Sequence, residues 1–167
     1  MSARRYRCLV SIGFAVCVAA TAWVPALAED LVGRAKIIDG DTLDIGGERV
    51  RLNGIDAPEK AQQCEAGPTA WACGSNATRA LASATQDGNV TCRGDKRDRY
   101  GRLLAVCYVN GVDLNAQMVR DGWALAYRRY SLAYVGEEAE ARAAGRGMWR
   151  GQFIEPWEWR SAQRPQR

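Results

Sequence analysis

The clearest pattern in the chain is a series of short alternating stretches between residues 31 and 55. Apolar and β-branched residues recur at about every second position, and Asp39-Gly40 and Gly46-Gly47 interrupt them. Alternation of this kind predicts half-buried strands, and the glycine-containing pairs predict tight turns between them. We therefore expect strands near residues 31–38, 41–46 and 48–55.

Helical and strand patterns alternate through the rest of the chain. After a loop at 60–68, alanine and leucine recur at helical spacing over residues 69–86. Two apolar strands at 89–93 and 103–109 enclose a charged loop. Further helices are predicted at 113–122, where Asp113 is a suitable N-cap, and at 137–149.

The order of three strands, a helix, two strands and two helices is typical of an OB-type barrel. We predict a mainly β, α+β fold, in which a five-stranded OB-fold β-barrel carries three α-helices. One such domain, spanning residues 29–160, accounts for most of the chain. A polar C-terminal tail is expected at residues 161–167.

The first 28 residues have a different character. Arg4, Arg5 and Arg7 precede an uncharged apolar run, and an Ala-x-Ala sequence ends at Ala28. This arrangement predicts a secretory signal peptide, residues 1–28, so that the mature protein is periplasmic or secreted without stable membrane association. An uncleaved membrane anchor is the alternative, because residues 8–28 approach the length that spans a bilayer.

Removal of the signal peptide changes the charge balance. The whole chain has 23 basic and 19 acidic residues, for a net charge of +4. Loss of the three N-terminal arginines leaves 20 basic residues against 19 acidic ones. Binding to nucleic acid would then depend on the local arrangement of charge and not on net charge.

Four cysteines remain in the mature chain, and an even number in a small exported protein predicts disulfides. Cys92 and Cys107 fall on the two strands that flank the charged loop, and Cys64 and Cys73 are close in sequence. We therefore predict the pairs 64–73 and 92–107. Free buried thiols are the alternative. A zinc site is disfavoured because the chain lacks both a CxxC pair and histidine.

Acidic residues gather at the predicted strand ends, with arginines near them. The four acids are Asp39, Asp41, Asp56 and Glu59. Calcium prefers carboxylate and carbonyl oxygens, and guanidinium groups bind phosphate through paired hydrogen bonds. Arg51 and Arg102 are the candidate phosphate ligands. Each acid taken alone fits an ordinary turn equally well.

Other residues narrow the chemistry. The absence of histidine excludes Ser–His–Asp and Cys–His catalysis, and no GxxxxGK[ST] loop supports ATP binding. Tyr100, Tyr127 and Tyr130 are candidates for stacking on bases. We interpret the remaining arginines of the C-terminal region, those of the sequence RSAQRPQR included, as surface charges.

Four motifs give the chain a family resemblance. "DGDT" (39–42), "RLNGIDAPE" (51–59), "DRYGR" (98–102) and "VRDGWA" (119–124) stand in the order and approximate spacing of the staphylococcal nuclease-like, or thermonuclease, family. The resemblance implies an OB-fold barrel with three helices that cleaves DNA and RNA with calcium. The expected products have 3′-phosphate and 5′-hydroxyl ends. We expect a monomer that acts on single-stranded or frayed nucleic acid.

The resemblance also implies the role of individual residues. Asp41 and Asp56 resemble the carboxylate ligands of one calcium ion. Ala57 stands where the family often has threonine and would lend its backbone carbonyl to the metal. Glu59 resembles the general base that activates the attacking water.

Arg51 and Arg102 resemble the pair that holds the phosphate, so we expect their loss to damage turnover more than the fold. The four cysteines depart from the family's best-known member, which has none. Two other functions stay open. One is an OB-fold nucleic-acid-binding module with weak or absent catalysis, and the other is hydrolysis of another phosphodiester in the cell envelope.

Overall fold

The computed structural model describes residues 30–164. The predicted signal peptide, residues 1–28, therefore lies outside the described residues. Within residues 30–164, no helix has both the length and the apolar character needed to span a bilayer.

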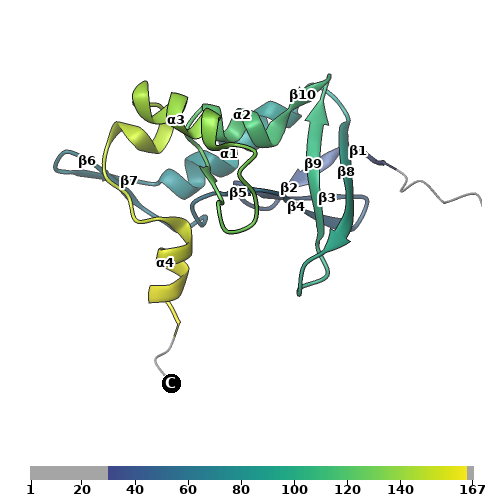
Figure 1. Cartoon of the computed structure of the whole chain (residues 1–167), viewed down its shortest axis with the longest axis horizontal. Coiled ribbons are helices and arrows are strands. Elements are labelled where there is room, and N and C mark those ends of the chain that lie inside the picture. Colours follow the sequence, from purple (N-terminus) through teal and green to yellow (C-terminus); the bar gives the residue numbers. More distant parts are fainter. Residues whose placement is uncertain (1–29, 165–167) are drawn as a thin grey trace, which may run out of the picture.

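A curled sheet forms one part of the molecule (Figure 1). Its strands follow the order β1-β8-β9-β4-β3-β2, and β10 pairs with β9. β4 runs parallel to β9, and the other neighbouring strands are antiparallel. The strands are β1 (Leu31–Gly33), β2 (Ala35–Ile37), β3 (Thr42–Ile45), β4 (Glu48–Leu52), β8 (Val90–Arg97), β9 (Leu103–Val109) and β10 (Val112–Asp113).

Helices and two short two-stranded pairs complete the described residues. β5 (Ile55–Asp56) pairs with β11 (Leu125–Ala126), and β6 (Cys64–Ala66) pairs with β7 (Thr69–Trp71). The helices are α1 (Cys73–Thr85), α2 (Leu114–Arg120), α3 (Val135–Ala143), the 3₁₀ turn η1 (Gly147–Arg150) and α4 (Pro156–Ala162). In Figure 1, α1, α2 and α3 lie together, whereas α4 points away from them.

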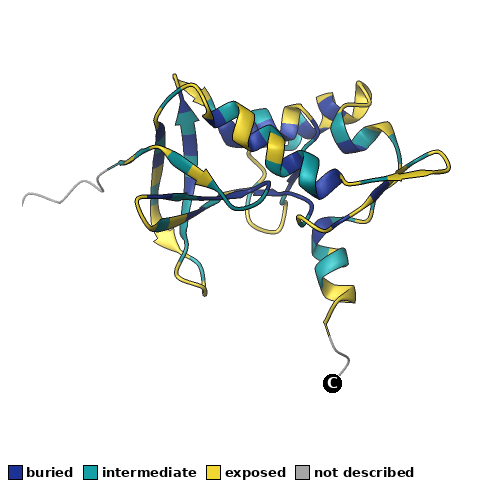
Figure 2. Cartoon of the chain, turned by 180° about the vertical axis from the view of Figure 1, so that it is seen from behind, coloured by how far each residue is buried: buried dark blue, intermediate teal, exposed yellow. Residues whose placement is uncertain are grey.

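The main hydrophobic core lies between the sheet and helices α1 and α2, where Figure 2 shows the buried residues concentrated. Leu43, Leu52, Leu81 and Val119 are fully buried there. A second, smaller cluster joins the C-terminal segment to the body of the protein. It consists of Cys64, Cys73, Leu125 and Met148, with Trp71, Trp149, Phe153 and Trp157 packed against them. This second cluster is what positions α4.

The predicted α+β class is confirmed, and its main sheet is curled, but several boundaries differ. The expected strand 31–38 is divided into β1 and β2, and the expected strand 89–93 continues to Arg97. The loop predicted at 60–68 contains β6, and the first residues of the helix predicted at 69–86 form β7. Backbone pairing between β6 and β7 outweighs the helical spacing of alanine there, so α1 begins only at Cys73.

The helices differ from the prediction at the C-terminus. The helix expected at 137–149 is α3 followed by η1, and residues 30–164 contain a fourth α-helix, α4. Ser161 and Ala162, which we assigned to a polar tail, belong to α4. Pro156 occupies the first turn of α4, a position that favours helix initiation.

Both predicted disulfides are confirmed. Cys64 bonds to Cys73, with 5.6 Å between their Cα atoms, and Cys92 bonds to Cys107, with 4.1 Å between theirs. Cys92 and Cys107 lie directly opposite each other on β8 and β9. The first disulfide links the start of β6 to the start of α1, so it closes the β6–β7 pair.

Candidate active site

The predicted site residues meet where β3, β4 and β5 adjoin. Thr42 of β3 lies opposite Arg51 of β4, which places Asp41, just before β3, next to Arg51. A turn with Gly54 at a φ of +81° separates β4 from β5, where Asp56 lies. A side chain at Gly54 would be strained at this φ. The strand pairing and this short connection therefore bring the charges of Asp41, Arg51 and Asp56 to one place.

Arg51 joins the two buried aspartates. Its Nη1 lies 2.6 Å from Asp41 Oδ1, and its Nη2 lies 2.5 Å from Asp56 Oδ1. Asp41 is 3% exposed and Asp56 is fully buried. Burial lowers the pKa of Arg51, but the charges of Asp41 and Asp56 outweigh burial and raise it. The guanidinium therefore stays charged between the carboxylates.

Asp41 is fixed by further hydrogen bonds. Its Oδ2 accepts from the backbone N–H of Ala57 at 2.8 Å, and its Oδ1 accepts from the hydroxyl of Thr42 at 3.0 Å. The preceding turn packs closely on Ala57, since a Cβ on Gly40 would lie 2.7 Å from the Ala57 Cβ. The residue predicted to offer its carbonyl to a metal is thus held beside the first predicted carboxylate ligand.

Burial and the repulsion between neighbouring carboxylates raise the pKa of two acids of the site. Burial and the neighbouring charge of Asp41 raise the pKa of Asp39 to about 6. Burial also raises the pKa of Asp56, against the opposing hydrogen bonds and charge of the arginines. The largest cause of both shifts is burial, which disfavours the charged form of a carboxyl group.

Arg102 lies at the edge of this group. Its Nε and Nη2 lie 2.8 and 2.7 Å from Asp98 Oδ2, and its Nη1 lies 3.4 Å from the hydroxyl of Thr42. Through Thr42 it is connected to Asp41, but it makes no contact with Asp56 or Glu59 among the contacts of residues 30–164. The Nη1 atom of Arg102 therefore faces the site through Thr42, while the rest of the guanidinium binds Asp98.

Glu59 and Asp56 share a partner that sequence reasoning missed. Arg160 of α4 places Nη1 2.9 Å from Glu59 Oε1 and Nη2 2.7 Å from Asp56 Oδ2. We interpreted this arginine as a surface charge, which is wrong: its side chain is 30% exposed and bridges two site carboxylates. One feature of the sequence could have indicated that Arg160 is held near the protein. This feature is the aromatic stretch 156–159 directly before it, whose Trp157 packs against Tyr127.

The three tyrosines do not form one platform. Tyr100, 68% exposed, lies in the turn between β8 and β9 beside Arg102. Tyr127 stacks on Trp157, with ring centroids 5.3 Å apart, and meets Tyr130 edge-on at 4.9 Å. One face of Tyr127 is therefore covered by α4, and Tyr130, also 68% exposed, is the more accessible of the pair.

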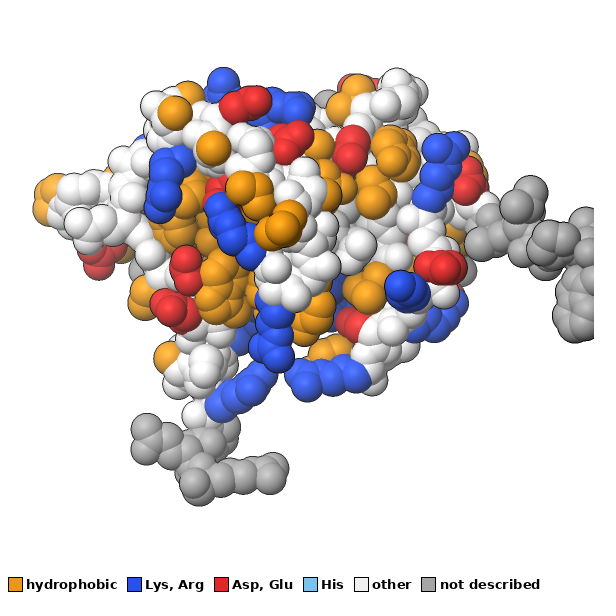
Figure 3. Space-filling model, viewed as in Figure 1, with side chains coloured by type: hydrophobic (Ala, Val, Ile, Leu, Met, Phe, Trp, Pro, Cys, Tyr) orange, Lys and Arg blue, Asp and Glu red, His pale blue; other side chains and the backbone are white. Residues whose placement is uncertain are grey.

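A groove of about 740 Å³ adjoins the site on the side of α4. The groove is lined by β11, by residues 127–129 directly after it, by α3 and by α4. Arg160 is one of the lining residues. Figure 3 shows lysine and arginine side chains between α4 and the β8–β9 turn. The charged residues that line the groove are Arg128, Arg129, Arg142, Arg160, Arg164, Glu138, Glu155 and Glu158.

Asp41 and Asp56 are the acids of this group that could contribute ligands to a hard divalent cation, although arginines bind both of them. Within residues 30–164 there is no group of three or more His, Cys, Asp or Glu that could hold a metal ion. Asp41 and Asp56 nevertheless face the same guanidinium, so their carboxylates converge on a point that already carries positive charge. With the Ala57 carbonyl and water, they would supply the oxygen ligands that calcium prefers.

Comparison with known proteins identifies the family. A sequence model described as staphylococcal nuclease homologue matches residues 49–151, more than half of the chain. This stretch contains five of the six predicted catalytic and metal-binding residues, namely Arg51, Asp56, Ala57, Glu59 and Arg102. Asp41 and Arg160 lie outside it.

Individual proteins agree with this match. The chain is 38% identical over 130 residues to a succinoglycan biosynthesis protein of Rhizobium meliloti, covering 75% of this chain and 68% of that protein. It is 37% identical over 157 residues to a micrococcal nuclease of Shigella flexneri, covering 83% and 85%. It is 36% identical over 145 residues to an uncharacterized endonuclease of Escherichia coli O157:H7, covering 81% and 89%.

Membership in this family implies that the curled sheet is an OB-fold, as predicted, and supports a nuclease function with a nucleic acid as substrate. The chain belongs to the staphylococcal nuclease homologue family.

Proposed function

We propose that the protein is an exported, calcium-dependent nuclease that cleaves DNA and RNA to 3′-phosphate and 5′-hydroxyl ends. The observation that carries this proposal is the convergence of Asp41, Arg51, Asp56 and Glu59 at one strand end, with Arg102 beside them. Two disulfides in the mature chain support an oxidising compartment such as the periplasm. We propose that the enzyme acts as a monomer.

The arginines would bind the scissile phosphate. Arg51 and Arg102 approach the site from β4 and from the start of β9, and guanidinium groups match phosphate oxygens in geometry and charge. Asp41, Asp56 and the Ala57 carbonyl would hold the calcium ion. When bound, calcium supplies positive charge for the phosphate oxygens, which gain negative charge as water attacks.

Glu59 would act as general base. Its side chain is 33% exposed, whereas Asp56 is fully buried, so Glu59 is the acid of this pair that water can reach readily. It would take a proton from the attacking water as the new bond from phosphorus to the water oxygen forms and the bond to the 5′ oxygen breaks. The leaving 5′ oxygen would take a proton from solvent to give the 5′-hydroxyl. General-base catalysis contributes about 10²–10⁴-fold in rate.

The groove beside α4 supports a preference for single-stranded or frayed nucleic acid. Its arginines outnumber its glutamates, and Tyr127 and Trp157 line it. Basic grooves with aromatic rings bind single strands by combining phosphate contacts with base stacking. We assign Tyr127 to this surface, with Tyr130 in edge-on contact with it, and we assign Tyr100 to the phosphate-binding region next to Arg102.

Digestion of single-stranded DNA and RNA by the purified mature protein tests the proposal. We expect cleavage in millimolar calcium, no cleavage with a chelator, and products with 3′-phosphate ends. Glu59→Gln should lower turnover by about 10²-fold or more. Glu65→Gln, which neutralises an exposed glutamate six residues away, is the matched control and should retain activity. Cleavage that survives chelation, or is unchanged by Glu59→Gln, would contradict the mechanism.

Hydrolysis of another envelope phosphodiester is the second candidate. The similarity to a protein named for succinoglycan biosynthesis favours it. In that case the same site residues would act, but nucleic acids would be cleaved slowly. Tight binding of oligonucleotides without cleavage in calcium would instead favour a binding module.

A further inference from the structure

We propose that Arg160 is a positioning residue, which uses the buried Asp56 as an anchor to hold the carboxylate of Glu59 in place. The inference rests on the proposed function in one respect, since it gives Glu59 a catalytic task. The contact itself, however, belongs to the fold and can be tested without nuclease activity.

The anchor is the contact between Arg160 and Asp56. Nη2 of Arg160 lies 2.7 Å from Asp56 Oδ2, and Nη1 lies 3.1 Å from Asp56 Oδ1. Two parallel hydrogen bonds of this kind fix the plane of a guanidinium. Asp56 is fully buried and also bound by Arg51, so it cannot follow movements of Arg160.

The positioned group is Glu59. The same Nη1 of Arg160 lies 2.9 Å from Glu59 Oε1. Among the ion pairs and hydrogen bonds of residues 30–164, the Glu59 carboxylate has no other partner. A glutamate side chain on a loop loses rotamer freedom when it is held in one conformation. Arg160 therefore supplies the contact that selects one position for this carboxylate.

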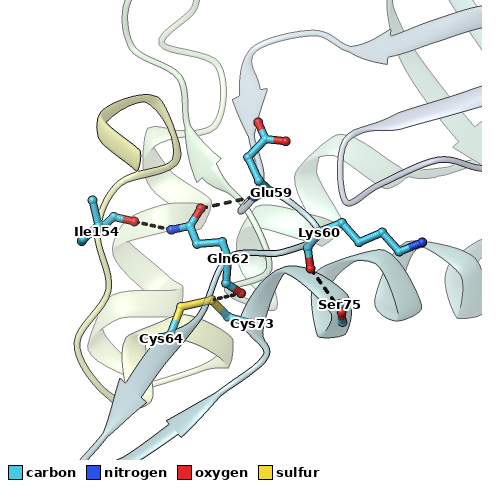
Figure 4. The surroundings of a disulfide bond; sticks show 7 residues. All are labelled: Glu59, Lys60, Gln62, Cys64, Cys73, Ser75 and Ile154. Atoms are coloured by element: carbon cyan, nitrogen blue, oxygen red, sulfur yellow. Dashed lines mark hydrogen bonds between the residues drawn. A yellow bond between two sulfur atoms is a disulfide. The ribbon is translucent and has the colours of Figure 1, made fainter. Parts of the chain in front are cut away.

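The backbone around Glu59 is tied to the same C-terminal segment (Figure 4). The Gln62 side chain accepts a hydrogen bond from the Glu59 N–H at 3.2 Å and donates one to the Ile154 carbonyl at 2.7 Å. Gln62 is fully buried. Residues 59–62 and the segment that leads into α4 therefore form one hydrogen-bonded unit.

Aromatic packing holds α4 in position for this contact. Trp157 stacks on Tyr127 with an angle of 5° between the ring planes, and Pro156 is buried. Arg160 follows Trp157 by three residues, so both side chains lie on neighbouring positions of one helix face. The helix is thus fixed at one end while its arginine reaches the carboxylates.

Two other roles for Arg160 make different predictions. As a purely structural tie, it would affect stability but leave turnover unchanged. As an inhibitory plug over the carboxylates, its removal would increase turnover. A positioning role requires that turnover falls and that the loss depends on Glu59.

The experiment compares Arg160→Gln, Arg160→Lys, Glu59→Gln and the double variant Arg160→Gln/Glu59→Gln in kcat, KM and urea unfolding. We expect Arg160→Gln to lower kcat by about 10–100-fold with KM little changed, as for partners that orient catalytic ligands. The double variant should lose no more turnover than Glu59→Gln alone. Lysine cannot span both carboxylates, so Arg160→Lys should recover only part of the activity.

Arg120→Gln is the matched control. Arg120 also bridges two carboxylates, Glu137 at 3.3 Å and Glu140 at 3.5 Å, but between α2 and α3. Its replacement should leave kcat unchanged. Unchanged or increased kcat in Arg160→Gln, full activity of Arg160→Lys, or independent losses in the double variant would each overturn the proposal.

Unfolding measurements separate this proposal from the proposed function. If the protein cleaves no nucleic acid, the nuclease proposal fails. The coupling between Arg160 and Glu59 is still measured in urea by the wild type, Arg160→Gln, Glu59→Gln and the double variant, where the effects of the two substitutions should be non-additive. Strictly additive effects on the free energy of unfolding would show that the contact is not made and would overturn the positioning role.

Discussion

The carbonyl oxygen of Glu59 packs against Gly74 so closely that a Cβ on Gly74 would lie 1.7 Å from it. Gly74 lies in the first turn of α1, and its N–H donates to the Gln62 carbonyl at 3.2 Å. Gly74→Ala must therefore displace either α1 or residues 59–62. We expect a loss of about 1–3 kcal/mol in the free energy of unfolding, and a fall in kcat, because the general base moves.

Gly136→Ala is the control for this substitution. Gly136 lies in α3, and no atom comes within 4 Å of a Cβ placed there. Alanine is favoured over glycine in a helix by up to about 1 kcal/mol, so this variant should be as stable as the wild type or more stable. Wild-type stability and kcat in Gly74→Ala would contradict the close packing.

Arg51→Gln should reduce stability in a way that depends on calcium. Without Arg51, the buried carboxylates of Asp41 and Asp56 lose the cation that both contact. Removal of one partner from a buried ion pair costs about 3–5 kcal/mol. A calcium ion between the carboxylates would replace part of that charge. Urea unfolding with calcium and with a chelator should therefore give a smaller loss in calcium; an equal loss in both would argue against a metal there.

Arg102→Gln should behave differently. Its partner Asp98 is a partly exposed residue of the same turn, and ion pairs near the surface contribute about 0–1 kcal/mol. We expect unfolding to change little while turnover falls strongly. From the sequence we expected that loss of either arginine damages turnover more than the fold. With the structure we keep this expectation for Arg102, whereas loss of Arg51 should reduce both turnover and stability.

Sequence reasoning was most successful where the site is local. Asp41, Arg51 and Asp56 lie within 16 residues, on strands whose alternating pattern and glycine turns are easily recognised. The register of β3 against β4 then places Asp41 beside Arg51, because each residue of a paired strand has a fixed partner on the neighbouring strand. Both disulfides were predicted for the same reason, since each links segments that are close in sequence.

Arg160 could not be found in this way. It lies 104 residues from Asp56 and 101 from Glu59, on a helix of seven residues. So short a helix is not stable alone, and here it depends on the stack between Trp157 and Tyr127. Similarly, β6 and β7 have three residues each, too few for a visible alternation. Tertiary contacts determine these elements, whereas the sequence alone suggested a polar tail at the end of α4, a loop for β6 and the start of a helix for β7.

Asp98→Asn should release Arg102. The Asp98 carboxylate accepts hydrogen bonds from the N–H groups of Tyr100 and Arg102 and from the Arg102 side chain. Although burial acts in the opposite direction, these bonds lower the pKa of Asp98 below 3.8. The ionised form therefore stabilises the fold above pH 3.8, and this contribution is lost as pH falls through the lower folded-state value.

We expect Asp98→Asn to raise KM, because Arg102 no longer has a fixed orientation toward the phosphate. The variant should also be about 1 kcal/mol less stable than the wild type at neutral pH. This difference should shrink as pH falls below 3.8. Asp95→Asn, at an exposed position of β8, is the control and should change neither quantity. A stability difference that stays constant at low pH would contradict this assignment.

The two disulfides should differ in their effect on activity. Cys64–Cys73 and Cys92–Cys107 close loops with sequence separations of 9 and 15, for which chain entropy predicts similar stabilisations of about 3 kcal/mol. Only the first lies beside the site, since the Cys73 sulfur is 3.5 Å from the carbonyl oxygen of Gln62. Gln62 in turn holds the backbone of Glu59.

We therefore expect the Cys64→Ser/Cys73→Ser variant to lose kcat at temperatures where it remains folded. The Cys92→Ser/Cys107→Ser variant should lose stability by a similar amount but keep the kcat of the folded protein, because its sulfurs lie in the main core between β8 and β9. Thermal unfolding and turnover measured on the same preparations check this. Equal kcat in the two variants would show that the first disulfide acts only on global stability.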